Sequence, residues 1–209
     1  MRKSKKPGVP RPPGFELFMA PLQVTLDTMD CESVGCAYLL SKYAHAKQTR
    51  DGGSRYFDHP KRAALIYINE LHGRNPRVII DLLLHDVLED TYLLSLGRFK
   101  LNFGEEIALD IRALTKLPKG KETTREYLLR NIERGPWTVL SKLCDRLDNL
   151  RTLDGCTQEK RVRTIKETKR YHVRLLIPAL RSHGGEWAAY ADILKKKIAD
   201  AIAVCEQTL

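Results

Sequence analysis

Apolar side chains recur along most of the chain at the three- and four-residue spacing of amphipathic helices, and no stretch alternates convincingly as a β-strand. Pro60 and Pro76 stand where the first turn of a helix accepts a residue without an N–H, and Gly73 falls in a break. The pattern therefore predicts a compact all-α, multi-helix bundle. The predicted helices span residues 33–48, 60–73, 76–90, 104–115, 122–133, 136–153, 157–182 and 186–206.

The N-terminal end differs in composition from the rest of the chain. Residues 1–14 are rich in proline, glycine, lysine and arginine, so we expect a disordered basic tail that buries little apolar surface. Residues 15–209 have the length of one globular domain. The sequence lacks both an apolar stretch long enough to span a membrane and the apolar segment of a secretory signal. We therefore expect a cytoplasmic protein without a membrane partner.

The formal net charge of +10 favours an anionic partner. The N-terminal tail supplies roughly half of this excess, and charge alone does not separate a nucleotide from a nucleic acid. The five cysteines are odd in number and lack Cys-x-x-Cys spacing, which indicates neither a disulfide framework nor a structural zinc cluster. Composition leaves the oligomeric state open, and a homo-oligomer is one of the options.

Candidate metal ligands are concentrated in one short segment. His85 and Asp86 follow a mainly apolar run, and Glu89 and Asp90 come about one helical turn later. Imidazole nitrogen and carboxylate oxygen suit Mn, Fe or Zn. The segment therefore offers metal ligands and candidate acid/base groups together.

A cation needs more than two ligands, and the chain offers further candidates. His59 directly follows the turn-rich loop 49–58, and such loops often carry binding residues on a rigid scaffold. Asp145, Asn149 and Thr152 have the i, i+4, i+7 spacing that lines one stripe of a helix. The remaining histidines lack acidic neighbours at ligand spacing, and we expect ordinary surface or core positions for them: His45, His72, His172 and His183.

The ordered set His59, His85–Asp86 and Asp145 resembles the four-ligand signature of the HD phosphohydrolase superfamily. Longer motifs extend the resemblance to the hydrolase domain of Rel/SpoT-type alarmone enzymes, from about residue 33 to about residue 181. These motifs are Tyr56-x-x-His59-Pro60, residues 85–91, Phe103-Gly104-Glu105-Glu106 with residues 114–117, and residues 145–153.

This resemblance implies a reaction and a cofactor. The family's hydrolase removes the 3′-pyrophosphate of the guanosine alarmones ppGpp and pppGpp, giving GDP or GTP plus pyrophosphate. The resemblance also implies a bound Mn²⁺, which lowers the pKa of water and neutralises phosphate charge. The implied metal ligands are His59, His85, Asp86 and Asp145.

Further roles carry over by the same resemblance. Glu89 and Asp90 would orient and deprotonate the attacking water. Arg50 would lie against the purine base, and Asn149 and Thr152 would contact the nucleoside.

Two positions depart from the family pattern, because Asp51 and Asp148 stand where the family often has Lys and His. Both add negative charge near a phosphate-rich ligand, which puts base and phosphate preference in doubt. Lys119 and Lys160, which match family positions loosely, are candidate compensating cations. The basic helix 160–174 is otherwise expected to be a solvated face.

Alternative functions follow from the same residues. The site would also suit an adenosine alarmone such as ppApp, or the 2′-phosphate of NADPH. A non-enzymatic module that binds an alarmone or nucleic acid is disfavoured, because the ligand set is complete. Long family members continue into a synthetase domain, whereas this sequence ends at Leu209. We therefore expect a stand-alone alarmone hydrolase that lowers alarmone levels or acts as an antitoxin against a toxic synthetase.

Overall fold

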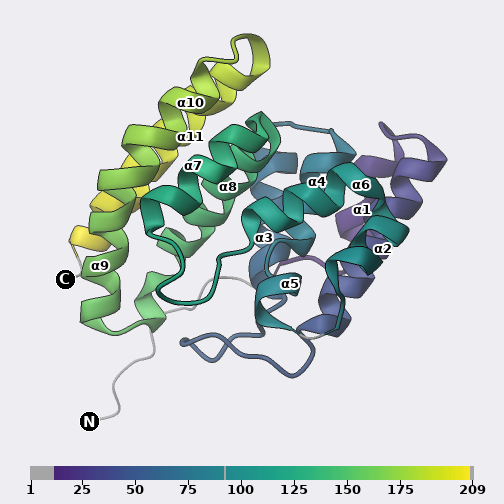
Figure 1. Ribbon diagram of the computed structural model, residues 1–209, viewed down its shortest axis with the longest axis horizontal. Coiled ribbons are helices and arrows are strands. Elements are labelled where there is room, and N and C mark those ends of the chain that lie inside the picture. Colours follow the sequence, from purple (N-terminus) through teal and green to yellow (C-terminus); the bar gives the residue numbers. More distant parts are fainter. Residues whose placement is uncertain (1–11, 92, 208–209) are drawn as a thin grey trace.

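The computed structural model describes residues 12–91 and 93–207 as a bundle of helices (Figure 1). Most of the predicted basic tail, residues 1–11, lies outside these ranges. Within them the chain forms no strand, and its β-structure is limited to one isolated antiparallel bridge between Thr49 and Arg55. The prediction of an all-α fold is confirmed.

The helices follow one another with short connections. Their bounds are α1 Phe15–Gln23, α2 Thr28–Ala44, α3 Asp58–Leu65, α4 Pro76–Leu84, α5 Val87–Asp90, α6 Leu96–Leu114, α7 Thr124–Arg134, α8 Pro136–Arg151, α9 Gln158–Glu167, α10 Ile177–Arg181 and α11 Gly185–Glu206. Two π-helical segments, η1 Ile66–Glu70 and η3 Thr168–Leu176, continue α3 and α9, and a short 3₁₀ turn, η2 Leu153–Gly155, follows α8.

Two N-terminal boundaries differ from the prediction. Helix α1 was not predicted, although it buries Phe18, Met19 and Leu22, because only two helical turns lie between the Pro-rich segment and the next helix. Helix α2 begins five residues earlier than predicted, at Thr28. The Asp27 side chain caps it by accepting a hydrogen bond of 2.8 Å from the Asp30 backbone N–H.

The predicted continuous helix 76–90 is wrong, because the chain breaks at His85 and Asp86 between α4 and α5. Asp86 has φ −94° and ψ −10°, the conformation of a turn rather than of a helix interior. A continuous helix would direct neighbouring side chains about 100° apart. The break lets the two side chains converge instead.

Helix α6 begins at Leu96 rather than at residue 104, and it is kinked at Gly104, where φ is +86°. Residues other than glycine rarely adopt this backbone conformation, so a glycine is favoured at the kink. The helix therefore continues on both sides of Gly104 and begins eight residues earlier than predicted.

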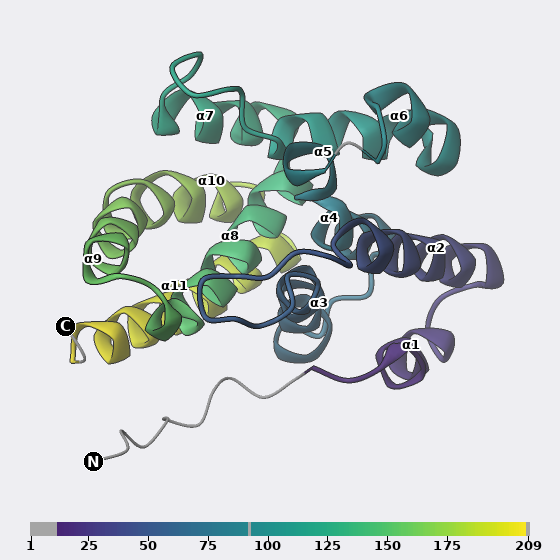
Figure 2. The same cartoon turned by 90° about the horizontal axis from the view of Figure 1, so that it is seen from below.

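Helix α8 lies in the middle of the bundle, and α3, α4 and α11 pack against it (Figure 2). Its apolar face includes the fully buried Leu140, Leu143 and Leu147, and every residue from Val78 to Leu84 of α4 is buried. Complete burial of a leucine side chain stabilises the fold by roughly 1.5–3 kcal/mol. The resulting core holds the ends of α3 and α4 rigidly over α8.

The described residues contain neither disulfides nor membrane spans. The thiol of Cys205 donates to the Leu150 carbonyl oxygen at 3.2 Å, and Cys144 is also buried. No helix in the described ranges combines the length and the apolar character needed to cross a membrane.

The loop between α2 and α3 is held against η2 by a close backbone approach. A Cβ atom built on Gly155 would lie 2.5 Å from the Cα of Gly52 and 2.9 Å from its N. The neighbouring ion pair between Lys160 Nζ and Asp51 Oδ2, at 2.7 Å, is about half exposed and adds little stability. The close approach leaves no room for a side chain at Gly155.

We expect the substitution Gly155→Ala to displace the loop, because the new methyl group and the Gly52 backbone cannot occupy the same space. Overpacking costs about 1–3 kcal/mol, which corresponds to roughly 5- to 150-fold faster amide exchange by local opening. Hydrogen exchange of residues 49–55 measures this effect. Gly97→Ala is the matched control, because its Cβ would meet only Ser95 Oγ at 3.9 Å. Equal exchange in both variants would contradict the expectation.

Candidate metal centre

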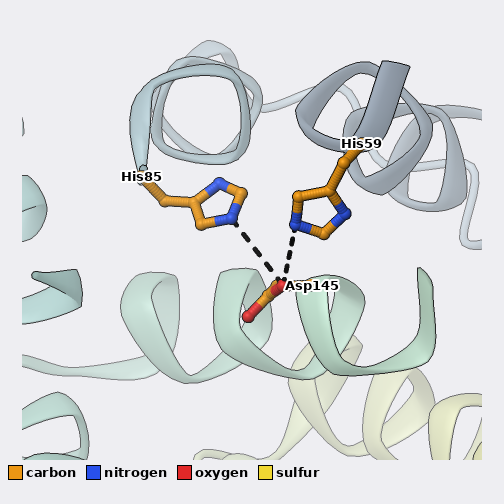
Figure 3. Close-up of side chains that lie close together, drawn as sticks. All are labelled: His59, His85 and Asp145. Atoms are coloured by element: carbon orange, nitrogen blue, oxygen red, sulfur yellow. Dashed lines mark ion pairs between the residues drawn. The ribbon is translucent and has the colours of Figure 1, made fainter. Parts of the chain in front are cut away.

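Three buried side chains from three helices meet at one point. His59 is the second residue of α3, His85 follows the last residue of α4, and Asp145 lies on α8. One nitrogen or oxygen atom of each lies within 4.8 Å of the other two, and no other such group occurs among residues 12–91 and 93–207. Figure 3 shows both imidazole rings directed at the Asp145 carboxylate.

Asp86 joins these three side chains, so the structure brings together all four residues expected to bind metal. Asp145 Oδ1 lies 3.1 Å from His59 Nε2 and 3.7 Å from His85 Nε2. Asp86 Oδ1 lies 3.2 Å from His85 Nε2, and Asp86 Oδ2 lies 3.7 Å from His59 Nε2. The Asp86 carboxylate therefore lies against both imidazoles, beside the three-residue group of His59, His85 and Asp145.

The hydrogen bonds of His85 show that this arrangement suits a cation. Its Nδ1 lies 2.9 Å from the Leu82 carbonyl oxygen, which can only accept, so Nδ1 carries a proton. The Nε2 atom is buried and has no hydrogen-bond partner. In the neutral ring this atom has a bare lone pair that faces carboxylate oxygens, which is a repulsive contact unless positive charge lies between them. A divalent cation fits this donor set.

The electrostatics of the protein alone also favour positive charge here. Burial disfavours the protonated form of His85. The carboxylates of Asp86 and Asp145 outweigh this effect of burial and raise the pKa of His85 to about 9. Burial opposes ionisation of Asp145, yet the ammonium of Lys142 and the two imidazoles hold the pKa of Asp145 well below its usual range. The centre is therefore built around ionised carboxylates.

Lys142, for which no role was predicted, orients the Asp145 carboxylate. Its buried ammonium contacts Asp145 Oδ2 and lies 5.5 Å from the centre of the Tyr127 ring. The other oxygen, Oδ1, remains directed at the imidazoles and accepts a hydrogen bond of 2.5 Å from Asn149 Nδ2. The i, i+3 spacing of Lys142 and Asp145 was the available signal in the sequence.

Asp148 does not lie where it was expected. Instead of adding charge beside the ligand, its 2% exposed side chain lies 2.6 Å from His59 Nδ1 and pairs with Arg62. Burial opposes ionisation, but the contacts with His59 and Arg62 lower the pKa of Asp148. Its charge is therefore balanced inside the fold, and it gives no reason to doubt phosphate binding.

Glu89 and Asp90 are exposed on α5, the short helix that directly follows His85 and Asp86 in the chain. The Tyr56 hydroxyl lies 2.9 Å from Asp86 Oδ2 and also contacts Asp90 Oδ2. Because a hydroxyl has one proton, Tyr56 donates to one carboxylate at a time. Glu89 Oε2 accepts a hydrogen bond of 3.0 Å from the Lys116 backbone N–H. The motif around Tyr56 was recognised in the sequence, but this contact was not predicted.

His45, expected to be an ordinary histidine, supports Tyr56. The two rings are stacked with centroids 4.6 Å apart and an interplanar angle of 18°. His45 Nδ1 lies 2.6 Å from Gln48 Oε1, and Gln48 Nε2 donates to the Asp90 carbonyl oxygen at 2.8 Å. Burial lowers the pKa of His45. The end of α2 therefore helps to hold both Tyr56 and the last residue of α5.

Only some of the expected nucleoside-binding residues reach the centre. Arg50 Nη2 donates to Asn149 Oδ1 at 2.6 Å, and Asn149 in turn contacts Asp145, so these residues are linked to the cluster. Thr152 Oγ1 donates to the Asp148 carbonyl oxygen at 2.9 Å, at the end of α8. Lys119 is exposed in the connection between α6 and α7.

A cavity of about 650 Å³ lies between the start of α7 and the helix formed by α9 and η3. Its lining includes the basic side chains of Arg163, Lys166 and Arg170 and the ring of Tyr171. Small-molecule sites commonly have volumes of about 300–1,000 Å³. Arg163, Lys166 and Arg170 are exposed, so this part of the basic helix is a solvated face, as predicted, and it also borders the cavity.

Comparison with known proteins finds relatives that match more than half of the chain in sequence. The chain is 36% identical over 167 residues to the guanosine-3′,5′-bis(diphosphate) 3′-pyrophosphohydrolase of Aquifex aeolicus (strain VF5), which covers 75% of this chain and 23% of that protein. It is also 36% identical over 141 residues to the GTP pyrophosphokinase rsh of Brucella ovis, covering 63% of this chain and 18% of that protein. The chain thus spans less than a quarter of the length of these relatives.

A solved structure shares the fold. It is described as "A metazoan ortholog of SpoT hydrolyzes ppGpp and plays a role in starvation responses", with a TM-score of 0.64 and 23% identity. The match covers 82% of this chain and 94% of that chain. Residues 37–175, which contain the whole His/Asp cluster, match the family model described as HD domain. The chain therefore belongs to the HD domain family and shows homology to Rel/SpoT-type hydrolases.

Proposed function

We propose that this protein is a metal-dependent 3′-pyrophosphohydrolase of ppGpp and pppGpp, which releases pyrophosphate and leaves GDP or GTP. The observation that carries the proposal is the buried cluster of His59, His85 and Asp145 next to an exposed acidic pair. The relative from Aquifex aeolicus, whose name specifies this reaction, supports the choice of substrate.

We propose Mn²⁺ as the metal, held by His59, His85, Asp86 and Asp145. Mixed imidazole and carboxylate donors suit Mn, Fe and Zn, and the bare Nε2 of His85 favours direct ligation. When bound, the ion would lower the pKa of water and neutralise phosphate charge. Lys142 and Asn149 would keep the Asp145 carboxylate oriented through their contacts with its two oxygens.

Glu89 and Asp90 are the proposed proton acceptors for the attacking water. Both are exposed, so the substrate and water can approach them, and Asp90 is joined to Asp86 through the Tyr56 hydroxyl. This connection keeps a carboxylate close to the centre without making it one of the four ligands. A positioned carboxylate of this kind contributes typically about 10²–10⁴-fold to a rate.

Arg50 and Asn149 are the proposed nucleoside contacts, because they link the loop to the centre. A guanidinium plane can stack on a purine base, and Arg50 Cζ already lies 5.7 Å from the centre of the Tyr56 ring. Thr152 remains a candidate at the end of α8. Phosphate groups would be balanced by Lys119 and Lys160. Lys160 is paired with Asp51, so a phosphate group would compete with Asp51 for this ammonium.

In the cell, we propose that residues 15–209 act as one cytoplasmic hydrolase domain. Its effect would be to lower alarmone levels in the stringent response, or to neutralise a toxic alarmone synthetase as an antitoxin. Both roles require only the hydrolysis of a small nucleotide, without a nucleic acid or a membrane as partner.

With Mn²⁺, we expect the protein to convert ppGpp into GDP and intact pyrophosphate, faster than it hydrolyses ppApp or NADPH. Chromatography that resolves all products across the three substrates measures this. Removal of metal by a chelator should stop turnover. Asp86→Asn should lower it more than about 100-fold, because losing a ligand should exceed the 10- to 100-fold cost of losing an outer partner.

Asp192→Asn is the matched control, because this carboxylate is half exposed on α11, where it pairs with Arg181, and its variant should keep wild-type turnover. Stepwise release of single phosphates would contradict the proposed reaction. Equal activity of wild type and Asp86→Asn would contradict the proposed site, and faster turnover of ppApp or NADPH would replace the proposed substrate.

We expect Asp90→Asn and Glu89→Gln each to lower kcat by about 10²–10⁴-fold, because each removes a proton acceptor. Mn²⁺ affinity should stay the same, since neither residue is a proposed ligand. Single-turnover kinetics and metal titration separate the two effects. Glu105→Gln, at an exposed carboxylate paired with Lys100, is the control. A wild-type kcat in both acidic-pair variants would rule out their catalytic role.

A further inference from the structure

Asp148 lies outside the four proposed metal ligands but is bonded directly to one of them. Its side chain is 2% exposed, and three nitrogen atoms surround its carboxylate. Oδ2 lies 2.6 Å from His59 Nδ1 and 3.2 Å from Arg62 Nη2, and Oδ1 lies 2.7 Å from Arg62 Nε. Both carboxylate oxygens are therefore occupied by partners within the fold.

These contacts determine which nitrogen of His59 carries the proton. The Arg62 guanidinium can only donate hydrogen bonds, so it favours an ionised Asp148 that can only accept. The short contact with Asp148 Oδ2 then requires His59 Nδ1 to be the donor. The neutral ring consequently has no proton on Nε2, which lies 3.1 Å from Asp145 Oδ1.

The same network joins the two helices that present the ligands. His59 and Arg62 are three residues apart on α3, so their side chains lie on one face of that helix. Asp148 lies on α8, three residues after Asp145. One carboxylate thus fixes the ring of His59 relative to the helix that carries the opposing ligand.

We propose that Asp148 is a positioning residue that acts through His59, and that Arg62 holds its carboxylate in place. The proposal rests on the metal site proposed above but not on the identity of the substrate. Outer carboxylates that accept from the second nitrogen of a ligating histidine typically contribute about 10- to 100-fold to metal affinity or activity.

The variant Asp148→Asn tests this role with almost no change of shape. Its amide oxygen would face Arg62 and its NH₂ group would face His59, so His59 Nδ1 would have to accept and Nε2 would carry the proton. We expect Mn²⁺ affinity of the metal-free full chain to fall by about 10- to 100-fold, measured by calorimetry with the metal alone. Unchanged affinity in the folded variant would overturn the proposal.

Glu70→Gln is the matched control. Glu70 accepts hydrogen bonds from Arg151 of α8 and pairs with Lys197 of α11, so its variant also loses an interhelical ion pair without touching His59. Its Mn²⁺ affinity should remain that of the wild type. An equal loss in both variants would indicate that any weakened helix contact lowers affinity, which would overturn a specific role for Asp148.

A double-mutant cycle separates action through His59 from a general effect of charge. In a His59→Ala background, Asp148→Asn should no longer change Mn²⁺ affinity, because the ring on which it acts is absent. Additive losses would overturn the proposal.

A measurement on the wild-type protein does not depend on how the variants fold. In the full chain loaded with diamagnetic Zn²⁺, ¹⁵N NMR of His59 should show a protonated Nδ1 and a metal-bound Nε2. A protonated Nε2 with a bare Nδ1 would overturn the proposal. Failure of the wild type to bind Mn²⁺ or Zn²⁺ would reject the metal site itself, whereas normal binding without ppGpp hydrolysis would reject only the proposed substrate.

Discussion

The structure depends on one electrostatic constraint, namely that imidazole lone pairs and ionised carboxylates converge at a buried point that requires positive charge. His85 shows this most clearly, because its Nδ1 is committed to a backbone carbonyl while its Nε2 faces the carboxylates of Asp86 and Asp145. Without a metal ion, a proton on His85 supplies this charge, because the carboxylates of Asp86 and Asp145 raise its pKa to about 9. The donor set of two imidazoles and two carboxylates also suits a divalent cation, which would supply the charge in place of the proton.

The rest of the fold meets this constraint by holding each donor from outside. Buried leucines of α4 and α8 fix the helices, and the break between α4 and α5 turns His85 and Asp86 toward the same point. Lys142 occupies one oxygen of Asp145, and Asp148 occupies the second nitrogen of His59. The ligands Asp145 and His59 are thus each oriented by a second residue that contacts the atom directed away from the metal centre. The metal ligands are therefore held by packed helices.

Much of this architecture could be predicted from the sequence, because helical periodicity and the order of the His and Asp residues are local properties. The helical break at His85 could not, since the apolar spacing continues through it. The roles of Lys142 and Asp148 depend on which way a side chain points between packed helices. The family resemblance implied that Asp148 lies near the ligand, whereas Arg62 and His59, 86 and 89 residues away in sequence, hold it in the interior.

The central claim is that these side chains bind one metal ion together, and anomalous diffraction from a crystal grown with Mn²⁺ tests it most directly. We expect a single manganese peak about 2.2 Å from His59 Nε2, His85 Nε2 and an oxygen each of Asp86 and Asp145. Manganese bound elsewhere, with His59 and His85 still bonded only to protein atoms, would contradict the account.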